Sequence, residues 1–220
     1  VFPSTKSIFQ NQHPNFEGEI LIQKDLSKTL QLIALNGRDG FYKGFVANKI
    51  NDSMALNGGL ITNEDLENYN PVWRQPLIST YRGNEIITMG PPSSGGVHII
   101  QMLNILEQYD LKKLTHNSFE YISLLTEVMK YAYADRSKYL GDPDFFKVPV
   151  SSITSKAYAK KINSNISIGI STPSSEILPG ANLDNESFET THYSVVDSEG
   201  NVVSSTYTLN SSFGSGVVME

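Results

Sequence analysis

Hydrophobic residues in the first quarter of the chain recur with the period of an amphipathic helix. Two runs show it: Leu26, Leu30, Ile33 and Ala34, followed by Phe41, Phe45, Val46 and Ile50. Gly37 is placed to end the first helix, and the pair Gly58 and Gly59 is placed to end the second. We therefore expect two helices within residues 25–57.

Shorter elements follow these two helices. The segment Thr-Asn-Glu-Asp at 62–65 has the pattern of a capping box, which predicts a short helix that stops before Pro71. Residues 75–82 and 85–89 have the pattern of two strands, and Gly83-Asn84 between them is typical of a tight hairpin turn.

Two longer helices are expected in the middle of the chain. The segment 97–109 is apolar on nearly every side, which predicts a buried helix. A second helix is expected over 118–139, with one apolar face formed by Phe119, Ile122, Leu125, Met129 and Ala132. Three tyrosines on it, at 131, 133 and 139, fit a core better than a stacking platform for bases.

Residues 163–189 differ from the rest of the chain. Ser, Asn, Pro and Glu dominate the segment, and Pro173 and Pro179 interrupt any periodicity. We expect a poorly ordered or extended strap. Its composition fits an ordinary linker and also the flexible segment that a self-cleaving precursor needs.

Residues 190–208 have the alternation of a β-hairpin. Tyr193, Val195, Val202 and Tyr207 follow the strand period. A three-residue loop of Ser198, Glu199 and Gly200 would pair Asp197 with Asn201. Counting back along both strands then places Thr190 opposite Thr208, with Asn210 two residues further along the same face.

A threonine hydroxyl is a weak nucleophile unless a neighbouring group accepts its proton. In some enzymes the α-amino group of an N-terminal threonine is that base, and its pKa of about 8 suits the task. An internal threonine has an amide nitrogen instead, so catalysis by Thr190 requires prior cleavage between Glu189 and Thr190. A Thr-rich strand without catalytic function is the alternative.

Composition excludes several other functions. The net charge is −6 with mixed signs, which argues against a nucleic-acid partner, and the absence of cysteine excludes disulfides and thiol chemistry. The four histidines lack metal-ligand spacing, so no metal or cofactor is expected. His192 lies on the same strand face as Thr190, which leaves a general base or a structural residue as its two interpretations. No apolar run reaches the roughly 18 residues of a membrane-spanning helix.

Three further motifs have two interpretations each. The segment 91–96, Pro-Pro-Ser-Ser-Gly-Gly, suits close packing at a helix start better than an anion site. Asp135 and Arg136 favour a structural role over a catalytic one. Asp142 and Asp144 favour an Asx turn over a calcium site, because two carboxylates supply too few oxygens.

The chain closely resembles the gamma-glutamyltransferases (glutathione hydrolases). The resemblance rests on the segment Thr-Thr-His-Tyr-Ser-Val-Val-Asp at 190–197 with Gly200-Asn201 and Thr-Tyr-Thr-Leu-Asn at 206–210. Upstream matches are Asn-Gly-Gly-Leu-Ile-Thr at 57–62, Pro-Pro-Ser-Ser-Gly-Gly-Val-His at 91–98, Tyr-Ala-Tyr-Ala-Asp-Arg at 131–136 and Tyr-Leu-Gly-Asp-Pro-Asp at 139–144. They occur in the family's order over nearly the whole chain.

This resemblance implies an α+β fold of the N-terminal-nucleophile hydrolase type, an αββα sandwich of which the chain holds a part. Residues 1–189 would be the C-terminal half of the large subunit, and 190–220 the first strands of the small subunit. The substrate-binding arginine, the Asp-Asp and Ser-Ser pairs and the Gly-Gly oxyanion hole of the family would lie outside this segment.

The implied activity is cleavage of γ-glutamyl amides such as glutathione, with transfer to water, amino acids or short peptides. Thr190 would be the nucleophile freed by autoproteolysis, Thr208 would orient it, and Asn210 would bind the γ-glutamyl group. The two subunits would form a heterodimer in the periplasm or outside the cell, with the signal peptide outside this segment. Cephalosporin-type acylases, poly-γ-glutamate processing enzymes and an inactive fragment remain the alternatives.

Overall fold

The computed structural model describes residues 3–9, 18, 20–177, 190–209 and 214–219. The chain divides into two compact units, one of Val1–Val72 with Glu186–Glu220 and the other of Trp73–Asn185.

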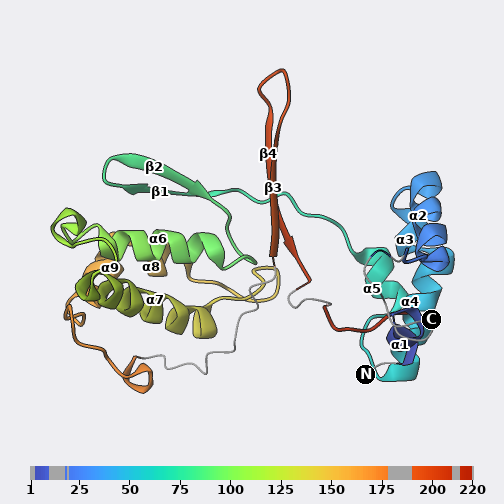
Figure 1. Ribbon diagram of the computed structural model, residues 1–220, viewed down its shortest axis with the longest axis horizontal. Helices are drawn as coiled ribbons and strands as arrows, with labels where there is room; N and C mark the ends of the chain where they lie inside the picture. The colour runs from blue at the N-terminus through green and yellow to red at the C-terminus, as the bar shows by residue number, and fades with distance from the viewer. Residues whose placement is uncertain (1–2, 10–17, 19, 178–189, 210–213, 220) are drawn as a thin grey trace. The chain divides into compact units, whose positions relative to one another are not determined.

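The first unit contains five described helices: α1 (Pro3–Phe9), α2 (Lys24–Asn36), α3 (Asp39–Tyr42), α4 (Gly44–Asn57) and α5 (Asn63–Asn68) (Figure 1). Gly37 and Gly58 follow α2 and α4 as predicted. The second predicted helix is wrong in one respect, because it is divided into α3 and α4. Lys43 is extended between them, and Gly44 has a φ of 64°. Gly40 allows α3 to pack closely on α2, since a Cβ there would lie 2.1 Å from the Leu32 carbonyl oxygen.

The capping box predicted at the start of α5 is confirmed. The Asp65 backbone N–H donates to Thr62 Oγ1 at 3.2 Å, and the Thr62 backbone N–H donates to Asp65 Oδ2 at 2.8 Å. Hydrogen bonds from the Thr62 side chain and backbone lower the pKa of the Asp65 carboxyl. The helix buries Leu66 and ends before Pro71.

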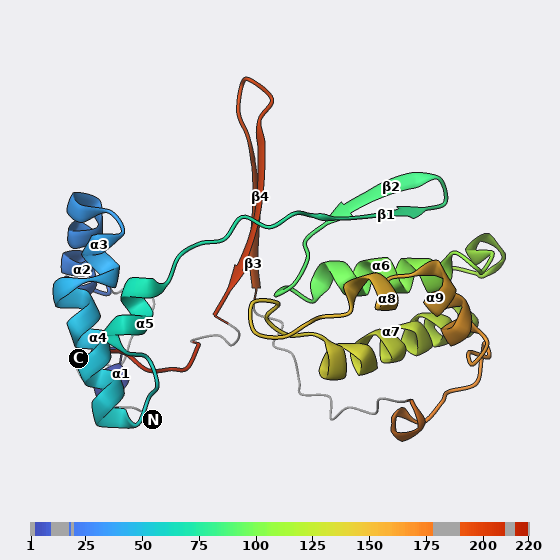
Figure 2. The same ribbon diagram turned by 180° about the vertical axis from the view of Figure 1, so that it is seen from behind.

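The second unit contains one hairpin and a group of helices. Its elements are β1 (Leu77–Tyr81), β2 (Asn84–Thr88), α6 (Gly95–Leu106), η1 (Leu111–Lys113), α7 (Phe119–Tyr139), α8 (Val150–Ile153), α9 (Lys156–Asn163) and η2 (Ser174–Glu176). Helices α6 and α7 lie side by side in both views (Figures 1 and 2). The core between them and α9 consists of Ile105, Leu106, Leu124, Val128, Ala159, Ile162 and Ile166.

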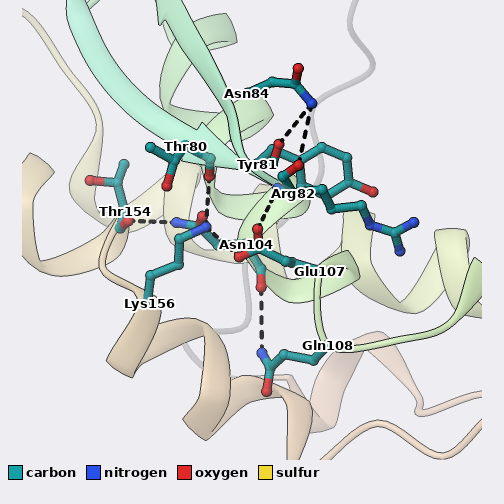
Figure 3. Close-up of polar contacts among 9 residues, drawn as sticks. All are labelled: Thr80, Tyr81, Arg82, Asn84, Asn104, Glu107, Gln108, Thr154 and Lys156. Carbon is teal, nitrogen blue, oxygen red and sulfur yellow. Dashed lines mark hydrogen bonds and ion pairs between the residues drawn. The ribbon is translucent and has the colours of Figure 1, made fainter.

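The turn between β1 and β2 lies one residue earlier than predicted. Tyr81 pairs with Asn84, so Arg82 and Gly83 form a two-residue turn with φ values of 49° and 83°. Such turns need positive φ at both positions. The Arg82 conformation is supported by its neighbours: its N–H donates to Glu107 at 2.6 Å, and Lys156 bridges Glu107 at 2.5 Å and the Thr80 carbonyl at 2.7 Å (Figure 3).

The predicted apolar face of α7 is wrong in part. Phe119, Ile122 and Met129 are 69%, 52% and 47% exposed, whereas Leu124, Val128 and Ala132 are buried. The buried side of the helix also carries Glu127 and Asp135, whose charges have partners on other segments. Helix α6 shows the same mixture, because its buried residues include His98, Gln101 and Asn104 while Ile99 is exposed.

Asp135 has a structural environment, as expected. Its carboxylate accepts hydrogen bonds from the Gln101 amide and, at 3.0 Å, from the Tyr158 hydroxyl. Burial raises the pKa of the Asp135 carboxyl, although Gln101, Tyr158 and Lys138 partly offset the effect. Burial, followed by the charge of Asp135, raises the pKa of Tyr158.

Asp135→Asn in the full-length protein is expected to match or exceed the wild type in stability at pH 7.5, by about 1 kcal/mol at most. Gln101 Oε1 has no partner among the described residues, so the amide of Gln101 can rotate to accept from the new asparagine. The raised folded-state pKa means that the wild type gains stability as pH falls through it. Urea unfolding at a series of pH values below 7.5 should therefore show the difference in stability shrinking as the pH falls. Asp135→Ala, which leaves Gln101 and Tyr158 without this partner, is the destabilised control.

The structure favours one interpretation for each of two further motifs, close packing for segment 91–96 and an Asx turn for Asp142 and Asp144. A Cβ at Gly96 would lie 1.9 Å from the Met89 carbonyl oxygen, so this glycine permits the close approach of α6 to the chain before it. The Asp144 backbone N–H donates to Asp142 Oδ1 at 3.0 Å, which confirms the Asx turn. Asp144 also pairs with Arg74 at 2.6 Å.

The first half of the predicted strap, residues 164–177, contains no strand or α-helix, which agrees with an extended segment, but it is anchored at particular residues. Ile166 and Ile177 are 9% and 2% exposed, Ile166 lies in the core cluster with residues of α7 and α9, and the Gly169 N–H donates to Ser123 of α7. Isolated isoleucines in a polar segment are enough to anchor it, because each removes a full apolar side chain from water. Residues 178–189 lie outside the described part of the chain.

Candidate active site

The predicted hairpin at the end of the chain is confirmed, together with its register. Strand β3 (Thr190–Val196) pairs antiparallel with β4 (Val202–Thr208). Thr190 lies directly opposite Thr208 at the open end of the hairpin. A shift of one residue would have moved Thr208 to the other face of the ladder.

The loop explains why this register is adopted. Gly200 has a φ of 84°, and its N–H donates to the Asp197 carbonyl at 3.2 Å. Asp197 Oδ1 accepts from the backbone N–H groups of Glu199 and Asn201, each at 2.9 Å, and Oδ2 accepts from the Asn201 side chain at 2.8 Å. Hydrogen bonds from Asn201 and then from the loop backbone lower the pKa of the Asp197 carboxyl. The loop thus has three residues, as the sequence predicts.

One face of the hairpin is lined with polar groups. His192 pairs with Thr206 two positions along the ladder from Thr190 and Thr208, and His192 Nδ1 lies 2.7 Å from Thr206 Oγ1. Further along, His192 Nε2 lies 3.4 Å from Ser194 Oγ and 3.3 Å from Ser204 Oγ. Hydroxyl groups thus lie within hydrogen-bond distance of both ring nitrogens of His192. They orient the ring, and none of them is charged.

The opposite face of the hairpin is more apolar. It carries Tyr193, Val195, Val203 and Tyr207 together with Thr191 and Ser205, and the two tyrosine rings meet edge to face with centroids 6.4 Å apart. The two tyrosines and two valines are between 48% and 58% exposed in this chain. The hairpin is therefore two-sided, with the paired threonines on the polar side.

The structure brings together two of the four predicted site residues. Thr190 and Thr208 occupy opposite positions of one ladder. Glu189 and Asn210 lie outside the described residues. The sequence analysis did not identify the hydroxyl groups around His192, which belong to Thr206, Ser194 and Ser204. Their spacing of two residues along each strand could have placed them on the face of His192.

Among the residues that the structure describes, no group of three or more His, Asp or Glu side chains is arranged to hold a metal ion. Of the helices in the described part of the chain, none has both the length and the apolar character needed to cross a membrane.

Comparison with known proteins gives a consistent result over the whole chain. A family model described as gamma-glutamyltranspeptidase matches residues 1–220. A glutathione hydrolase proenzyme of Escherichia coli (strain K12) is 53% identical over 216 residues, which are 98% of this chain and 37% of that protein. An acylase ACY 1 proenzyme of Pseudomonas sp. (strain SE83) is 46% identical over 200 residues, 91% of this chain and 35% of that protein. The chain thus spans little more than a third of the length of these relatives.

The fold is similar to that of a solved relative. The crystal structure of Helicobacter pylori gamma-glutamyltranspeptidase matches with a TM-score of 0.74 and 49% identity, over 81% of this chain and 52% of that chain. This match confirms the predicted α+β fold class of the N-terminal-nucleophile hydrolase type.

Proposed function

This chain belongs to the gamma-glutamyltranspeptidase family, and on that premise we propose that the whole protein cleaves γ-glutamyl amides such as glutathione. The observation that carries the proposal is the pairing of Thr190 with Thr208 at the open end of the β3–β4 hairpin. A nucleophile there has a second hydroxyl-bearing residue opposite it, on a polar face that continues through His192 and Thr206.

The first step of the proposed reaction uses the two polar atoms of an N-terminal Thr190. Its freed α-amino group accepts the hydroxyl proton while Oγ attacks the γ-carbonyl carbon of the substrate. The amide C–N bond then breaks, the leaving amine takes the proton, and a γ-glutamyl ester remains on Thr190. Water, an amino acid or a short peptide releases the γ-glutamyl group in the second step.

Other residues assist this step in the proposal. Thr208 orients the nucleophile from the opposite strand, and Asn210 contacts the γ-glutamyl group. Oxyanion donors, each worth about 3 kcal/mol to such a reaction, come from the remainder of the protein. The chain spans about 37% of the length of the Escherichia coli relative, which is compatible with this division.

Maturation uses the same hydroxyl in the proposal. Thr190 Oγ attacks the Glu189 carbonyl, the peptide C–N bond breaks as the nitrogen takes up a proton, and water hydrolyses the resulting ester. Residues 1–189 then belong to a large subunit and 190–220 to the start of a small one, which remain together as a heterodimer. The proenzyme names of the relatives from Escherichia coli and Pseudomonas support such a maturation.

The partners of the mature protein follow from this activity. They are glutathione and other γ-glutamyl compounds as donors, and amino acids or dipeptides as acceptors. We propose that the protein is periplasmic or secreted and acts on γ-glutamyl compounds outside the cytoplasm. No cofactor or metal enters the proposed chemistry.

A related acylase is the second candidate function. The 46% identity to an acylase proenzyme favours it. The same N-terminal threonine could cleave another amide if the rest of the substrate pocket binds it. The substrate side of the pocket decides between the two functions, and much of it belongs to the rest of the protein.

One experiment tests the proposed function directly. Purified full-length protein is assayed on a γ-glutamyl anilide and on a glutaryl-cephalosporin, and its intact mass is measured. We expect two chains divided between Glu189 and Thr190 and turnover of the anilide. Turnover of the cephalosporin alone would favour the acylase, and an uncut chain with full transferase activity would refute the N-terminal threonine mechanism. This segment by itself should be inactive.

A further inference from the structure

Three polar atoms on one face of the β3–β4 hairpin form a nearly equilateral triangle. His192 Nε2 lies 3.4 Å from Ser194 Oγ and 3.3 Å from Ser204 Oγ, and the two serine oxygens lie 3.4 Å apart. Ser194 and Ser204 are directly opposed in the ladder, two positions beyond the pair of His192 and Thr206. We name His192, Ser194 and Ser204 the polar triangle.

The sides of the polar triangle are long for hydrogen bonds. Strong bonds between such groups have donor–acceptor distances of about 2.7–3.0 Å, so each side exceeds them by about 0.5 Å. The other ring nitrogen of His192 differs, because Nδ1 lies only 2.7 Å from Thr206 Oγ1. All three side chains of the triangle are exposed in this chain. Thr206 thus fixes the ring, while the three atoms of the triangle remain accessible to another molecule.

The polar triangle can present three donors to one acceptor. When the Thr206 hydroxyl donates to Nδ1, the hydrogen of the neutral ring is on Nε2, and each serine hydroxyl has one hydrogen of its own. An oxygen atom about 2 Å above the plane of the triangle would lie about 2.8 Å from all three atoms. An anionic oxygen gains most from such donors, and neither strand contains an acidic residue that would repel it. The triangle therefore suits one oxygen of a carboxylate.

The distance from Thr190 selects the length of the ligand. The triangle lies two to four residues from Thr190 along the ladder, which is about 7–13 Å. An extended two-residue group attached at the reacting carbonyl spans about 7 Å, and a hydrogen bond extends its reach to about 10 Å. A single residue spans only about 3.5 Å. The carboxylate that reaches the triangle thus belongs to a dipeptide.

The direction along the hairpin also fits the departing side of the substrate. In the proposed reaction Asn210 contacts the γ-glutamyl group, and Asn210 follows Thr208 in the sequence. Thr206 and Ser204 precede Thr208 on the same strand. The acyl group and the leaving group of one amide point away from each other, so the leaving group is directed toward the triangle.

We propose that the polar triangle binds the terminal carboxylate of a dipeptide, as the leaving group of glutathione in the first step and as the acceptor in the second. This inference rests on the proposed function and adds a site for the amine half of the substrate. The site favours a dipeptide with a free carboxylate over a single amino acid or an amine without a carboxylate.

The test compares three donors in the full-length, cleaved protein. They are glutathione, glutathione with its glycine carboxylate converted to an amide, and a γ-glutamyl anilide, whose leaving group has no carboxylate. Ser194→Ala/Ser204→Ala removes two of the three donors, and His192→Phe retains a ring without nitrogens. Ser205→Ala is the matched control, because Ser205 pairs with Tyr193 on the opposite face of the same hairpin.

We expect the ratio of kcat/KM for glutathione to kcat/KM for the anilide to fall at least tenfold in both triangle variants, mainly through the KM for glutathione. Ser205→Ala should keep the wild-type ratio. In the wild type the amide of glutathione should lose the same factor as the variants lose on glutathione. The variants should lose little more on this amide, because the contact is already absent.

Other results overturn the carboxylate site. Equal losses on glutathione and the anilide would assign the triangle to the folding of the hairpin or to the chemistry at Thr190, and an unchanged ratio would leave it without a role in binding. A wild-type protein that uses the amide as well as glutathione would also refute the site, and this comparison needs no variant that folds. A wild-type protein inactive on all three donors refutes the proposed function itself.

Discussion

Full-length protein carrying Thr190→Ala is expected to remain a single uncut chain without γ-glutamyl transfer. Alanine has no hydroxyl to attack the Glu189 carbonyl, so the chain is not divided and no N-terminal amine is formed at this position. Removal of an enzyme's nucleophile typically lowers kcat by 10⁴-fold or more. Intact mass and turnover of a γ-glutamyl anilide are the two measurements.

Two matched variants make this result specific. Thr190→Ser retains the hydroxyl and should still cut and turn over, at a reduced rate. Thr191→Ala changes the neighbouring residue, which pairs with Tyr207 on the other face of the hairpin, and should leave both measurements close to the wild type. Cleavage in Thr190→Ala would show that another group attacks the Glu189 carbonyl.

Thr208→Val is expected to impair cleavage and turnover far more than folding. Valine has nearly the shape of threonine and a high strand preference, so a structural Thr208 would lose one hydrogen bond of about 1 kcal/mol at most. If Thr208 orients the nucleophile, Thr190 is free to turn away from the attack geometry. A misplacement of about 1 Å can lower a rate on the order of a hundredfold.

The next pair on the same face of the hairpin supplies the control for this variant. Thr206 lies two residues before Thr208, further from the open end, and its hydroxyl lies 2.7 Å from His192 Nδ1. Thr206→Val should match Thr208→Val in melting temperature but retain most of the activity. Normal turnover in Thr208→Val would show that Thr208 does not orient the nucleophile and is an ordinary strand residue.

The elements predicted well from the sequence are those whose signals are local. The capping box of Thr62 and Asp65 joins residues three apart, and the helix start at Ser118 is fixed by its own side chain. The β3–β4 register follows from the Asp197–Asn201 loop alone, because alternation then carries the pairing back to Thr190 and Thr208. In each case the residues that decide the local structure lie within a few positions of one another in the sequence.

The outcome was different where distant segments compete for one surface. Periodicity marks an apolar stripe on α7 but does not say which side is covered, and the structure buries Leu124 and Val128 rather than Phe119 and Ile122. The hairpin turn at Arg82 depends on Glu107 and Lys156 from two other elements.

By itself, the sequence determined the starts of α5 and α7, the register of the β3–β4 hairpin and, through its motifs, the family to which the chain belongs. Only the tertiary structure decided where residues 164–177 are anchored, because their polar composition predicts an extended strap and names no partner for it. Glu127 and Lys130 lie more than forty residues from Thr172 and carry charges that normally face water. The Thr172 backbone supplies a hydrogen bond to each of these two side chains, and that contact exists only in the folded chain.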